Sequence, residues 1–145
     1  MVAIIDYGVG NLFSLCSSLK MIGAESIVTS DKEVIKKADK IILPGVGAFG
    51  DAADKLSKTG LREVITDEAN KGKDIMGICL GMQLLFQKSY EYGEHKGLGL
   101  LKGEIVPMEG SLPADLKIPH IGWNKLIFKK KSHLLSYINE GDCVY

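Results

Sequence analysis

The fold is decided by residues 74–85, which run Asp-Ile-Met-Gly-Ile-Cys-Leu-Gly-Met-Gln-Leu-Leu. The apolar segment Asp74–Ile78 has the length of one buried strand, and Leu80–Lys88 has apolar residues at helical spacing. Between them lies Gly77-Ile78-Cys79-Leu80-Gly81, the glycine–x–nucleophile–x–glycine pattern of a tight turn from strand to helix. The stretch predicts a strand–turn–helix unit that carries a cysteine on its turn.

Upstream of this unit the sequence alternates between strand and helix patterns. Short apolar runs predict strands at 2–5, 26–29 and 40–43, and helical spacing predicts helices at 11–22, 31–35 and 51–70, the last interrupted near 59–60. Continuously apolar strands that alternate with helices are typical of a parallel sheet covered on both faces. The predicted fold class is therefore α/β, with a doubly wound, mostly parallel sheet.

Beyond Gly97 the pattern changes to shorter strands, expected at 100–108, 124–128 and 142–145, between turns that contain proline and glycine. No internal repeat or linker divides the sequence, so we predict one domain over residues 1–145. Its final strand has no stop signal, which leads us to expect a domain that is incomplete at the C-terminus and lacks its last strands.

Composition limits the classes of function. The 145 residues carry 18 basic and 18 acidic side chains, so no overall field favours nucleic acid or an anionic membrane surface. The start of the chain has no basic leader, and its apolar run is too short for a signal peptide. Three widely spaced cysteines fit neither a disulfide framework nor a metal site and favour a reducing cytoplasm. We predict a cytoplasmic protein with no metal and no cofactor.

Cys79 is the strongest candidate for a catalytic residue. A strained turn would hold its side chain at the C-terminal edge of the sheet, and the N-terminus of the following helix would favour the reactive thiolate. The backbone N–H of Leu80 would point into the same space as an oxyanion donor. The alternative is a buried structural cysteine, which is the interpretation we prefer for Cys16 and Cys143.

A second loop, Pro44-Gly45-Val46-Gly47-Ala48-Phe49, follows the strand expected at 40–43. Because ligands of open parallel sheets bind beyond the carboxyl ends of the strands, this loop should face the same crevice as Cys79. Its glycines let the backbone approach a ligand, and Val46 or Gly47 would supply a second oxyanion donor. A tight turn without a ligand is the alternative. Residues 6–11 border the same edge but lack a phosphate-loop pattern.

These motifs resemble the class I, or triad, glutamine amidotransferases, which implies a flavodoxin-like fold. The resemblance rests on Cys79-Leu80-Gly81-Met82-Gln83 and Leu43-Pro44-Gly45-Val46-Gly47-Ala48-Phe49. Two further segments, Asp6-Tyr7-Gly8-Val9-Gly10-Asn11 and Pro119-His120-Ile121-Gly122-Trp123-Asn124, are similar to the glutaminase-subunit family of the imidazole glycerol phosphate synthases of histidine biosynthesis.

The resemblance implies that Cys79 attacks the side-chain amide of glutamine, forms a thioester and releases ammonia. By the same resemblance, the oxyanion donors are backbone groups of Val46, Gly47 and Leu80, and the substrate is held at Gly45, Gln83 and Glu91.

The family also implies a heterodimer in which a cyclase subunit with a (β/α)8 barrel receives the ammonia. The residues that would face this partner are Asn11, Pro119, His120, Trp123 and Asn124. Tryptophan is frequent among the residues that dominate binding energy at interfaces, although packing inside its own core is the alternative for Trp123.

One departure from the family pattern concerns the catalytic base. Members carry a His-Pro-Glu segment, whereas His95, His120 and His133 of this sequence are not followed by Pro-Glu. Losing general acid–base catalysis costs about 10²–10⁴-fold in rate. We therefore expect the 145 residues alone to have no useful glutaminase activity. Two alternatives stay open: another hydrolase with an elbow cysteine, against which Gln83 and Glu91 argue, and a non-catalytic α/β domain that binds a partner.

Overall fold

A computed structural model describes residues 1–113 and 116–145 of the chain. The chain divides into two compact units, Met1–Pro107 and Met108–Tyr145. That residues 1–145 form one domain stays a prediction.

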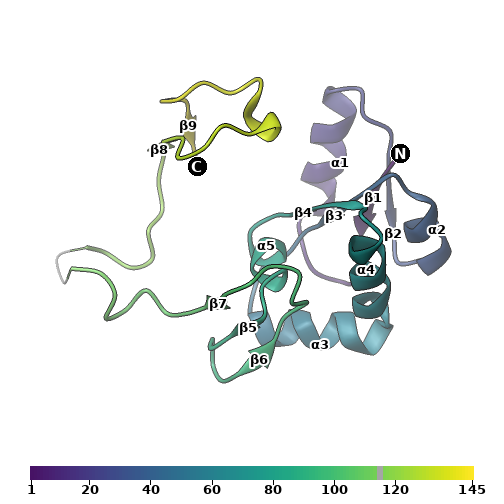
Figure 1. Cartoon of the computed structure of the whole chain (residues 1–145), viewed down its shortest axis with the longest axis horizontal. Helices are drawn as coiled ribbons and strands as arrows, with labels where there is room; N and C mark the ends of the chain where they lie inside the picture. The colour runs from purple at the N-terminus through teal and green to yellow at the C-terminus, as the bar shows by residue number, and fades with distance from the viewer. Residues whose placement is uncertain (114–115) are drawn as a thin grey trace. The chain divides into compact units, whose positions relative to one another are not determined.

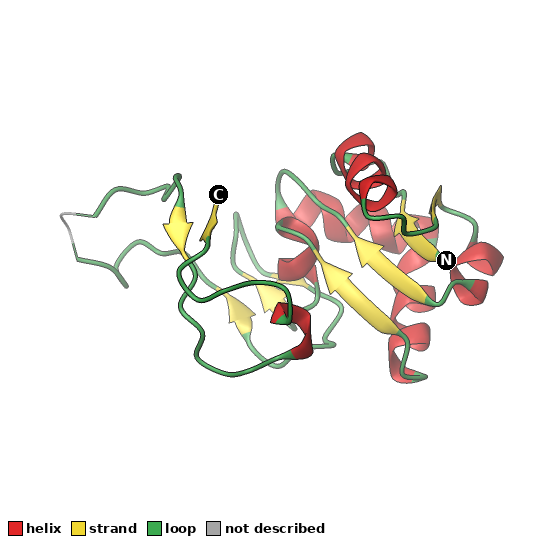
Figure 2. Cartoon of the chain, turned by 90° about the horizontal axis from the view of Figure 1, so that it is seen from above, coloured by secondary structure: helices red, strands yellow, loops and turns green. Residues whose placement is uncertain are grey.

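The first unit is built on a parallel sheet of four strands, a count that covers residues 1–107, all of which the structure describes. The strands are β1 (Val2–Ile5), β2 (Ser26–Thr29), β3 (Lys40–Leu43) and β4 (Asp74–Gly77), in the order β2-β1-β3-β4 (Figures 1 and 2). Their register aligns Ile4 with Val28 and Ile42, and Ile42 with Met76. The parallel α/β fold and the positions of these strands were therefore predicted correctly.

Helices cover both faces of this sheet. They are α1 (Leu12–Met21), α2 (Lys32–Lys37), α3 (Phe49–Thr59), α4 (Leu61–Asn70) and α5 (Leu80–Leu84). Helix α1 lies on the opposite side of the sheet from α3 and α4 (Figure 1). The predicted interruption falls between α3 and α4, where Gly60 takes a left-handed conformation with φ +66°. Helix α2 begins where predicted, because the Asp31 side chain accepts hydrogen bonds from the N–H groups of Glu33 and Val34.

The core lies on the face covered by α2, α3 and α4. Its fully buried side chains come from β1, β3, these helices and α5: Ile5, Ile35, Ile41, Leu43, Phe49, Leu56, Leu61, Ile65 and Leu84. Helix α1 differs, because none of its residues is fully buried. Cys16 on α1 is only half-buried, which corrects its interpretation as a fully buried structural cysteine.

The segment after the elbow also differs from the prediction. Helix α5 ends at Leu84 rather than at Lys88, because β5 (Lys88–Ser89) pairs with β6 (His95–Lys96) and with β7 (Glu104–Ile105). These backbone hydrogen bonds compete with further helical turns. The strand expected at 100–108 is reduced to the two residues of β7.

The second unit contains a hairpin and one short helical turn. Strand β8 (Asn124–Lys125) pairs antiparallel with β9 (Cys143–Val144), and η1 spans His133–Leu135. Cys143 is exposed on β9, so its interpretation as a strand-core residue is wrong.

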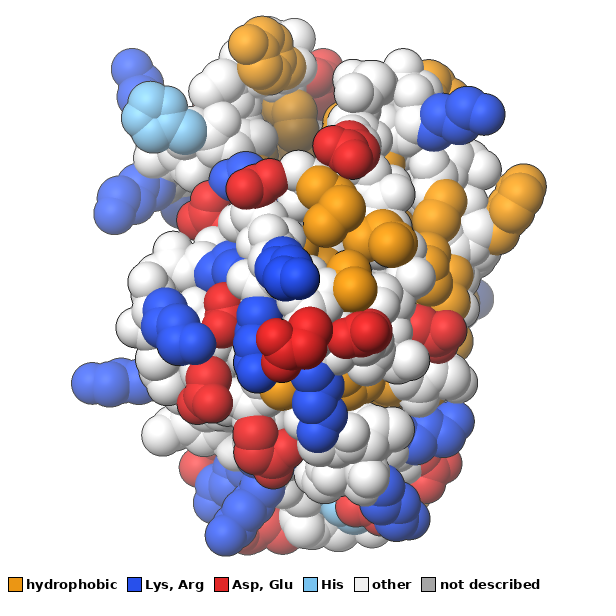
Figure 3. Space-filling model, turned by 90° about the vertical axis from the view of Figure 1, so that its right-hand side faces the viewer, with side chains coloured by type: hydrophobic (Ala, Val, Ile, Leu, Met, Phe, Trp, Pro, Cys, Tyr) orange, Lys and Arg blue, Asp and Glu red, His pale blue; other side chains and the backbone are white. Residues whose placement is uncertain are grey.

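The surface carries mixed charge. Figure 3 shows basic and acidic side chains interspersed on one face, beside a band of hydrophobic side chains. No helix in the described part of the chain has both the length and the apolar character needed to cross a membrane.

Candidate active site

Cys79 lies on a strained turn between β4 and α5. Its backbone has φ +55° and ψ −118°, a conformation that costs a residue with a side chain about 1–3 kcal/mol. Hydrogen bonds on both sides hold it there. The N–H of Ile78 donates to the Leu43 carbonyl at 3.0 Å, and the N–H of Met82 donates to the Cys79 carbonyl at 3.0 Å. The thiol side chain is exposed, so it is free to meet a substrate.

The two glycines of the motif are required by close packing. A methyl group at Gly81 would collide with the carbonyl of Leu43, the last residue of β3. At Gly77 it would lie 2.5 Å from the Cα atom of Met82. The elbow can therefore reach this position only without side chains on either flank of Ile78-Cys79-Leu80, which explains the spacing of the motif.

The loop at 44–47, which we call the oxyanion loop, packs directly against the elbow. A methyl group at Gly45 would lie 2.7 Å from the backbone nitrogen of Gly81 and 2.9 Å from Leu80 Cβ. Gly45 is buried, whereas Val46 and Gly47 are exposed. As the first residue of α5, Leu80 has an N–H without an acceptor inside its own helix. The structure thus brings together the two segments that we predicted to supply oxyanion donors.

Glu91 contacts the backbone of Phe49, two residues beyond the oxyanion loop. Its Oε2 atom accepts a hydrogen bond of 2.6 Å from the N–H of Phe49, the first residue of α3. The N-cap residue Ala48 has no side-chain oxygen, so Glu91 caps α3 in its place. The N–H of Glu91 in turn donates to the hydroxyl of the fully buried Ser89 at 3.1 Å. Gln83, the other predicted substrate residue, is half-buried on α5.

Tyr7 lies at this site, although its role was not predicted from the sequence. Its hydroxyl donates a 2.6 Å hydrogen bond to the carbonyl of Pro44, and its side chain is buried. Burial raises the pKa of the Tyr7 phenol to about 12, so the group stays a protonated donor at neutral pH. The signal was its position within the segment Asp6–Asn11, which we expected to border the same edge of the sheet as Cys79, but nothing in the pattern indicated a buried hydroxyl.

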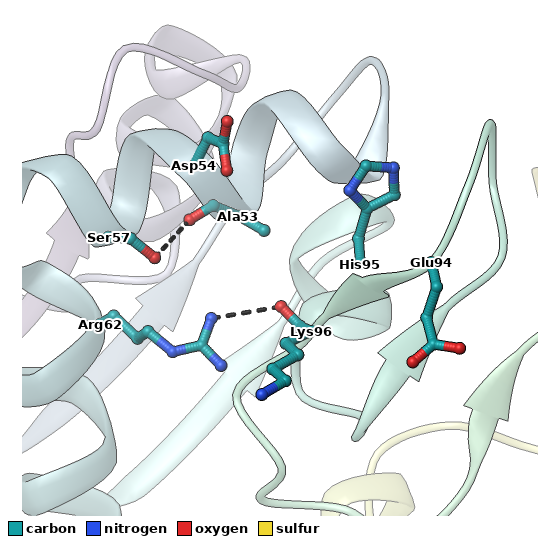
Figure 4. Close-up of a pocket in the computed structure, with 7 residues that line it drawn as sticks. All are labelled: Ala53, Asp54, Ser57, Arg62, Glu94, His95 and Lys96. Atoms are coloured by element: carbon teal, nitrogen blue, oxygen red, sulfur yellow. Dashed lines mark hydrogen bonds between the residues drawn. The ribbon is translucent and has the colours of Figure 1, made fainter.

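A separate polar cavity of about 420 Å³ lies beside α3 (Figure 4). Its lining comes from α3, α4 and the β6 segment: Ala53, Asp54, Ser57, Arg62, Glu94, His95 and Lys96. Arg62 points across the cavity and donates to the carbonyls of Lys96, at 3.2 Å, and of Gly97. None of the lining residues belongs to the elbow or the oxyanion loop. We interpret it as a groove that Arg62 braces, distinct from the candidate active site.

The residues predicted to face a partner are distributed over both units. Asn11, in the first unit, is exposed and caps α1, because its Oδ1 accepts from the N–H of Ser14 at 3.2 Å. Pro119, His120, Trp123 and Asn124 are exposed in the second unit. Trp123 is 72% exposed and meets Tyr145 edge-on, with ring centroids 5.6 Å apart. This exposure contradicts the alternative that Trp123 packs inside its own core.

The described residues contain no cluster of three His, Cys, Asp or Glu side chains with the geometry to hold an ion.

A cysteine on a strained strand-to-helix turn, with a glycine loop packed against it above a parallel sheet, defines an α/β protein of the nucleophile-elbow class. The family model "Glutamine amidotransferase class-I" matches residues 3–144. The chain belongs to the class I glutamine amidotransferase family, as its motifs predicted.

Relatives and solved structures agree with this assignment. "Imidazole glycerol phosphate synthase subunit HisH" of Aquifex aeolicus is 54% identical over 143 residues, which are 98% of this chain and 67% of that protein. The protein of the same name from Bacillus subtilis is 48% identical, over 97% of this chain and 68% of its own length.

Among solved structures, a crystal structure of a glutamine amidotransferase superposes with a TM-score of 0.65 at 20% identity, covering 77% of this chain and 59% of that one. A putative peptidase E from Listeria monocytogenes gives a TM-score of 0.58 at 16% identity, covering 69% of this chain and 62% of that one. At these identities both structures support the fold alone.

Proposed function

We propose that this chain is the glutamine-hydrolysing subunit of an imidazole glycerol phosphate synthase in histidine biosynthesis, with Cys79 as its nucleophile. The observation that carries the proposal is the strained backbone of Cys79, held between packed glycines with the oxyanion loop against it. The relatives that share about half of its residues over nearly its whole length bear that enzyme's name.

The geometry supports acyl transfer through a thioester. The Cys79 thiolate forms a C–S bond with the side-chain amide carbon of glutamine, and the carbonyl electrons move onto oxygen. Backbone N–H groups of Leu80 and of Val46 or Gly47 stabilise this oxyanion. When the carbonyl re-forms, the protonated nitrogen leaves as ammonia, and water then cleaves the thioester to glutamate.

We assign the binding of glutamine to Gly45, Gln83 and Glu91. Glu91 uses Oε2 on the N–H of Phe49, which leaves Oε1 for the ammonium group of an amino acid. Gly45 lets the backbone approach the ligand, and Gln83 lies one helical turn beyond Cys79. The carboxylate of Glu91 and the amide of Gln83 suit glutamine better than a peptide, which argues against another elbow-cysteine hydrolase.

The mechanism also needs a base that takes the thiol proton and later protonates the leaving nitrogen. None of the three histidines of the sequence, His95, His120 and His133, is followed by the Pro-Glu that marks the family's base. We therefore expect a polypeptide of these 145 residues to release ammonia from glutamine about 10²–10⁴-fold more slowly than an enzyme with a complete triad. A coupled glutamate dehydrogenase assay measures this rate, and release at the full enzymatic rate would contradict the expectation.

The proposed partner is a cyclase subunit with a (β/α)8 barrel, which receives the ammonia in a cytoplasmic heterodimer. The exposed side chains of Asn11, Pro119, His120, Trp123 and Asn124 support such an interface. The exposed Trp123 has the size and the polar N–H that make tryptophan a frequent anchor of protein interfaces.

One labelling experiment tests the proposed function. The protein is incubated with the chloroketone analogue of glutamine, and the modified cysteine is mapped by mass spectrometry. We expect the label on Cys79 and protection by free glutamine. Equal labelling of the exposed Cys143 would contradict a built glutamine site, and absence of any label would favour a non-catalytic domain that binds a partner.

A further inference from the structure

The oxyanion loop is held at both ends by side chains from distant segments. At its start, the carbonyl of Pro44 accepts the hydrogen bond from Tyr7, 37 residues away in sequence. Just past its end, the N–H of Phe49 donates to Glu91, 42 residues away. The second contact belongs to a residue that we assign to substrate binding, whereas the first has no role in the proposed mechanism.

Three groups converge on the space that a side chain at Gly45 would occupy. They are the backbone nitrogen of Gly81 at 2.7 Å, Leu80 Cβ at 2.9 Å and the Tyr7 hydroxyl at 3.0 Å. The Tyr7 hydroxyl therefore contacts the oxyanion loop where the loop meets the elbow. Because the Pro44 carbonyl and the Gly45 nitrogen share one peptide plane, fixing that carbonyl also fixes the direction in which the chain enters Val46 and Gly47.

We propose that Tyr7 is a positioning residue: its hydroxyl sets the orientation of the oxyanion loop so that a backbone N–H of Val46 or Gly47 faces the oxyanion formed on Cys79. This inference rests on the proposed function. Tyr7 touches neither substrate nor thiol in this role; it acts through Pro44. The phenol suits the task because it is buried in the core and remains protonated across the working pH range.

Two electrophiles separate positioning from a general structural role. The Cys79 thiolate forms a C–S bond with the ketone carbon of the chloroketone analogue of glutamine, and the carbonyl electrons move onto oxygen as an oxyanion that the loop stabilises. The sulfur then moves to the adjacent carbon, chloride leaves and the ketone re-forms, which gives a stable thioether. Iodoacetamide reacts by direct displacement: the thiolate forms a C–S bond, iodide leaves, and no oxyanion develops. A change that only misorients the loop slows the first reaction and spares the second.

The experiment compares Tyr7→Phe with wild type for both reagents, with the rate measured at Cys79 by mass spectrometry. We expect the maximal rate of chloroketone inactivation to fall roughly 10- to 100-fold, because a misplaced donor loses much of its effect. The concentration for half-maximal rate and the iodoacetamide rate should stay within about twofold of wild type. Tyr137→Phe removes the same hydroxyl from a fully exposed side chain and should change neither rate.

A second variant guards against loss of folding. Gly45→Ala keeps the Tyr7 hydroxyl but inserts a methyl group where the three groups converge, so the maximal rate of chloroketone inactivation should fall while the iodoacetamide rate stays within about twofold of wild type. Because Gly45 is also assigned to glutamine binding, the concentration for half-maximal rate is compared only for Tyr7→Phe. Circular dichroism confirms that each variant is folded. Equal chloroketone rates in wild type and Tyr7→Phe would overturn the role of Tyr7. A parallel fall in the rates of reaction with the chloroketone and with iodoacetamide would overturn it as well. A wild-type protein that the chloroketone does not modify at Cys79 would contradict the proposed function itself.

Discussion

The two units of the chain differ in how many of their side chains are buried. In residues 1–107, side chains from β1, β3 and the four helices α2, α3, α4 and α5 form one buried core, and the elbow helix α5 contributes Leu80 and Leu84 to it. In the described residues of the second unit, 108–113 and 116–145, no side chain is fully buried. The strained turn at Cys79 lies in the unit with the packed core, because packing and hydrogen bonds around a strained residue offset the cost of its backbone conformation.

The second unit exposes apolar surface instead of burying it. Its strands β8 and β9 have two residues each, and an isolated two-stranded hairpin is at best marginally stable in water. Large side chains on its surface include Ile121, Trp123, Ile127, Leu134 and Tyr137. Exposed apolar surface of this kind is typical of segments that contact another protein. The difference between the units can be tested by paired changes, one in each.

The largest difference is expected for the cysteines. Cys79→Ala should abolish modification by the chloroketone analogue of glutamine, because the only thiol on the elbow is removed. Cys143→Ala, in the second unit, should leave the extent of labelling unchanged. Intact-mass spectrometry after complete reaction measures both. One label per molecule of Cys79→Ala would show that the reactive thiol is not Cys79. The first unit would then no longer be distinguished from the second by a reactive cysteine.

Core substitutions should show the next largest effect. Leu56 on α3 is fully buried, so Leu56→Ala should lower the free energy of unfolding by about 2–5 kcal/mol. Leu134 in the second unit is 73% exposed. Leu134→Ala should therefore change the free energy of unfolding by no more than about 0.5 kcal/mol. Urea denaturation followed by circular dichroism measures both. A loss of more than 2 kcal/mol for Leu134→Ala would show that the second unit has a core of its own.

Much of the first unit was predictable from sequence because its signals are local. Continuous apolar runs located the strands, and Asp31 marked the start of α2 through its capping side chain. The elbow was predictable because a residue with φ +55° flanked by close-packed glycines requires a particular spacing, which the sequence shows directly. The glycines that follow the strand at 40–43 indicated the oxyanion loop, and the family resemblance added Glu91, which no local pattern identifies.

What sequence could not predict depends on long-range contacts. The end of α5 at Leu84 follows from the pairing of β5 with β6 and β7, partners up to 16 residues away. The hydrogen bond from the Tyr7 hydroxyl to the Pro44 carbonyl joins two loops. The spacing of apolar residues along the sequence does not indicate such a contact. The exposure of Cys143 and the half-burial of Cys16 were missed because a hydrophobic pattern indicates which side chains prefer burial and does not show what covers them.

The stability of the first unit should depend on pH through Glu68. Hydrogen bonds from Lys71 and Lys73 lower the pKa of this carboxyl from 4.5 to about 2. Lys73 also donates to the carbonyls of Ile35 and Lys36, so the ion pair links the end of α4 to α2.

Because the folded-state pKa is depressed, the contribution of Glu68 is complete above pH 4.5 and is lost as the pH falls toward 2. Urea midpoints measured between pH 6 and pH 2.5 should therefore fall more steeply for wild type than for Glu68→Gln. Parallel curves for the two proteins would show that the carboxyl contributes nothing in this range.

The smallest paired effect concerns helix caps of similar chemistry in the two units. Asp31 accepts from the N–H groups of Glu33 and Val34 at 2.8 and 3.4 Å, and Asp31→Ala should cost about 1 kcal/mol of unfolding free energy. Asp31→Asn keeps an acceptor and should recover most of that loss. Ser132 accepts from the N–H of Leu134 at 3.3 Å, but it caps only the three residues of η1. Since η1 buries none of its side chains, Ser132→Ala should leave the urea midpoint unchanged, even though the hydrogen bond removed is of the same kind. A measurable fall in the urea midpoint for Ser132→Ala would mean that η1 unfolds together with the sheet of the first unit. The second unit would then contribute to the stability of the first, contrary to the difference in burial between them.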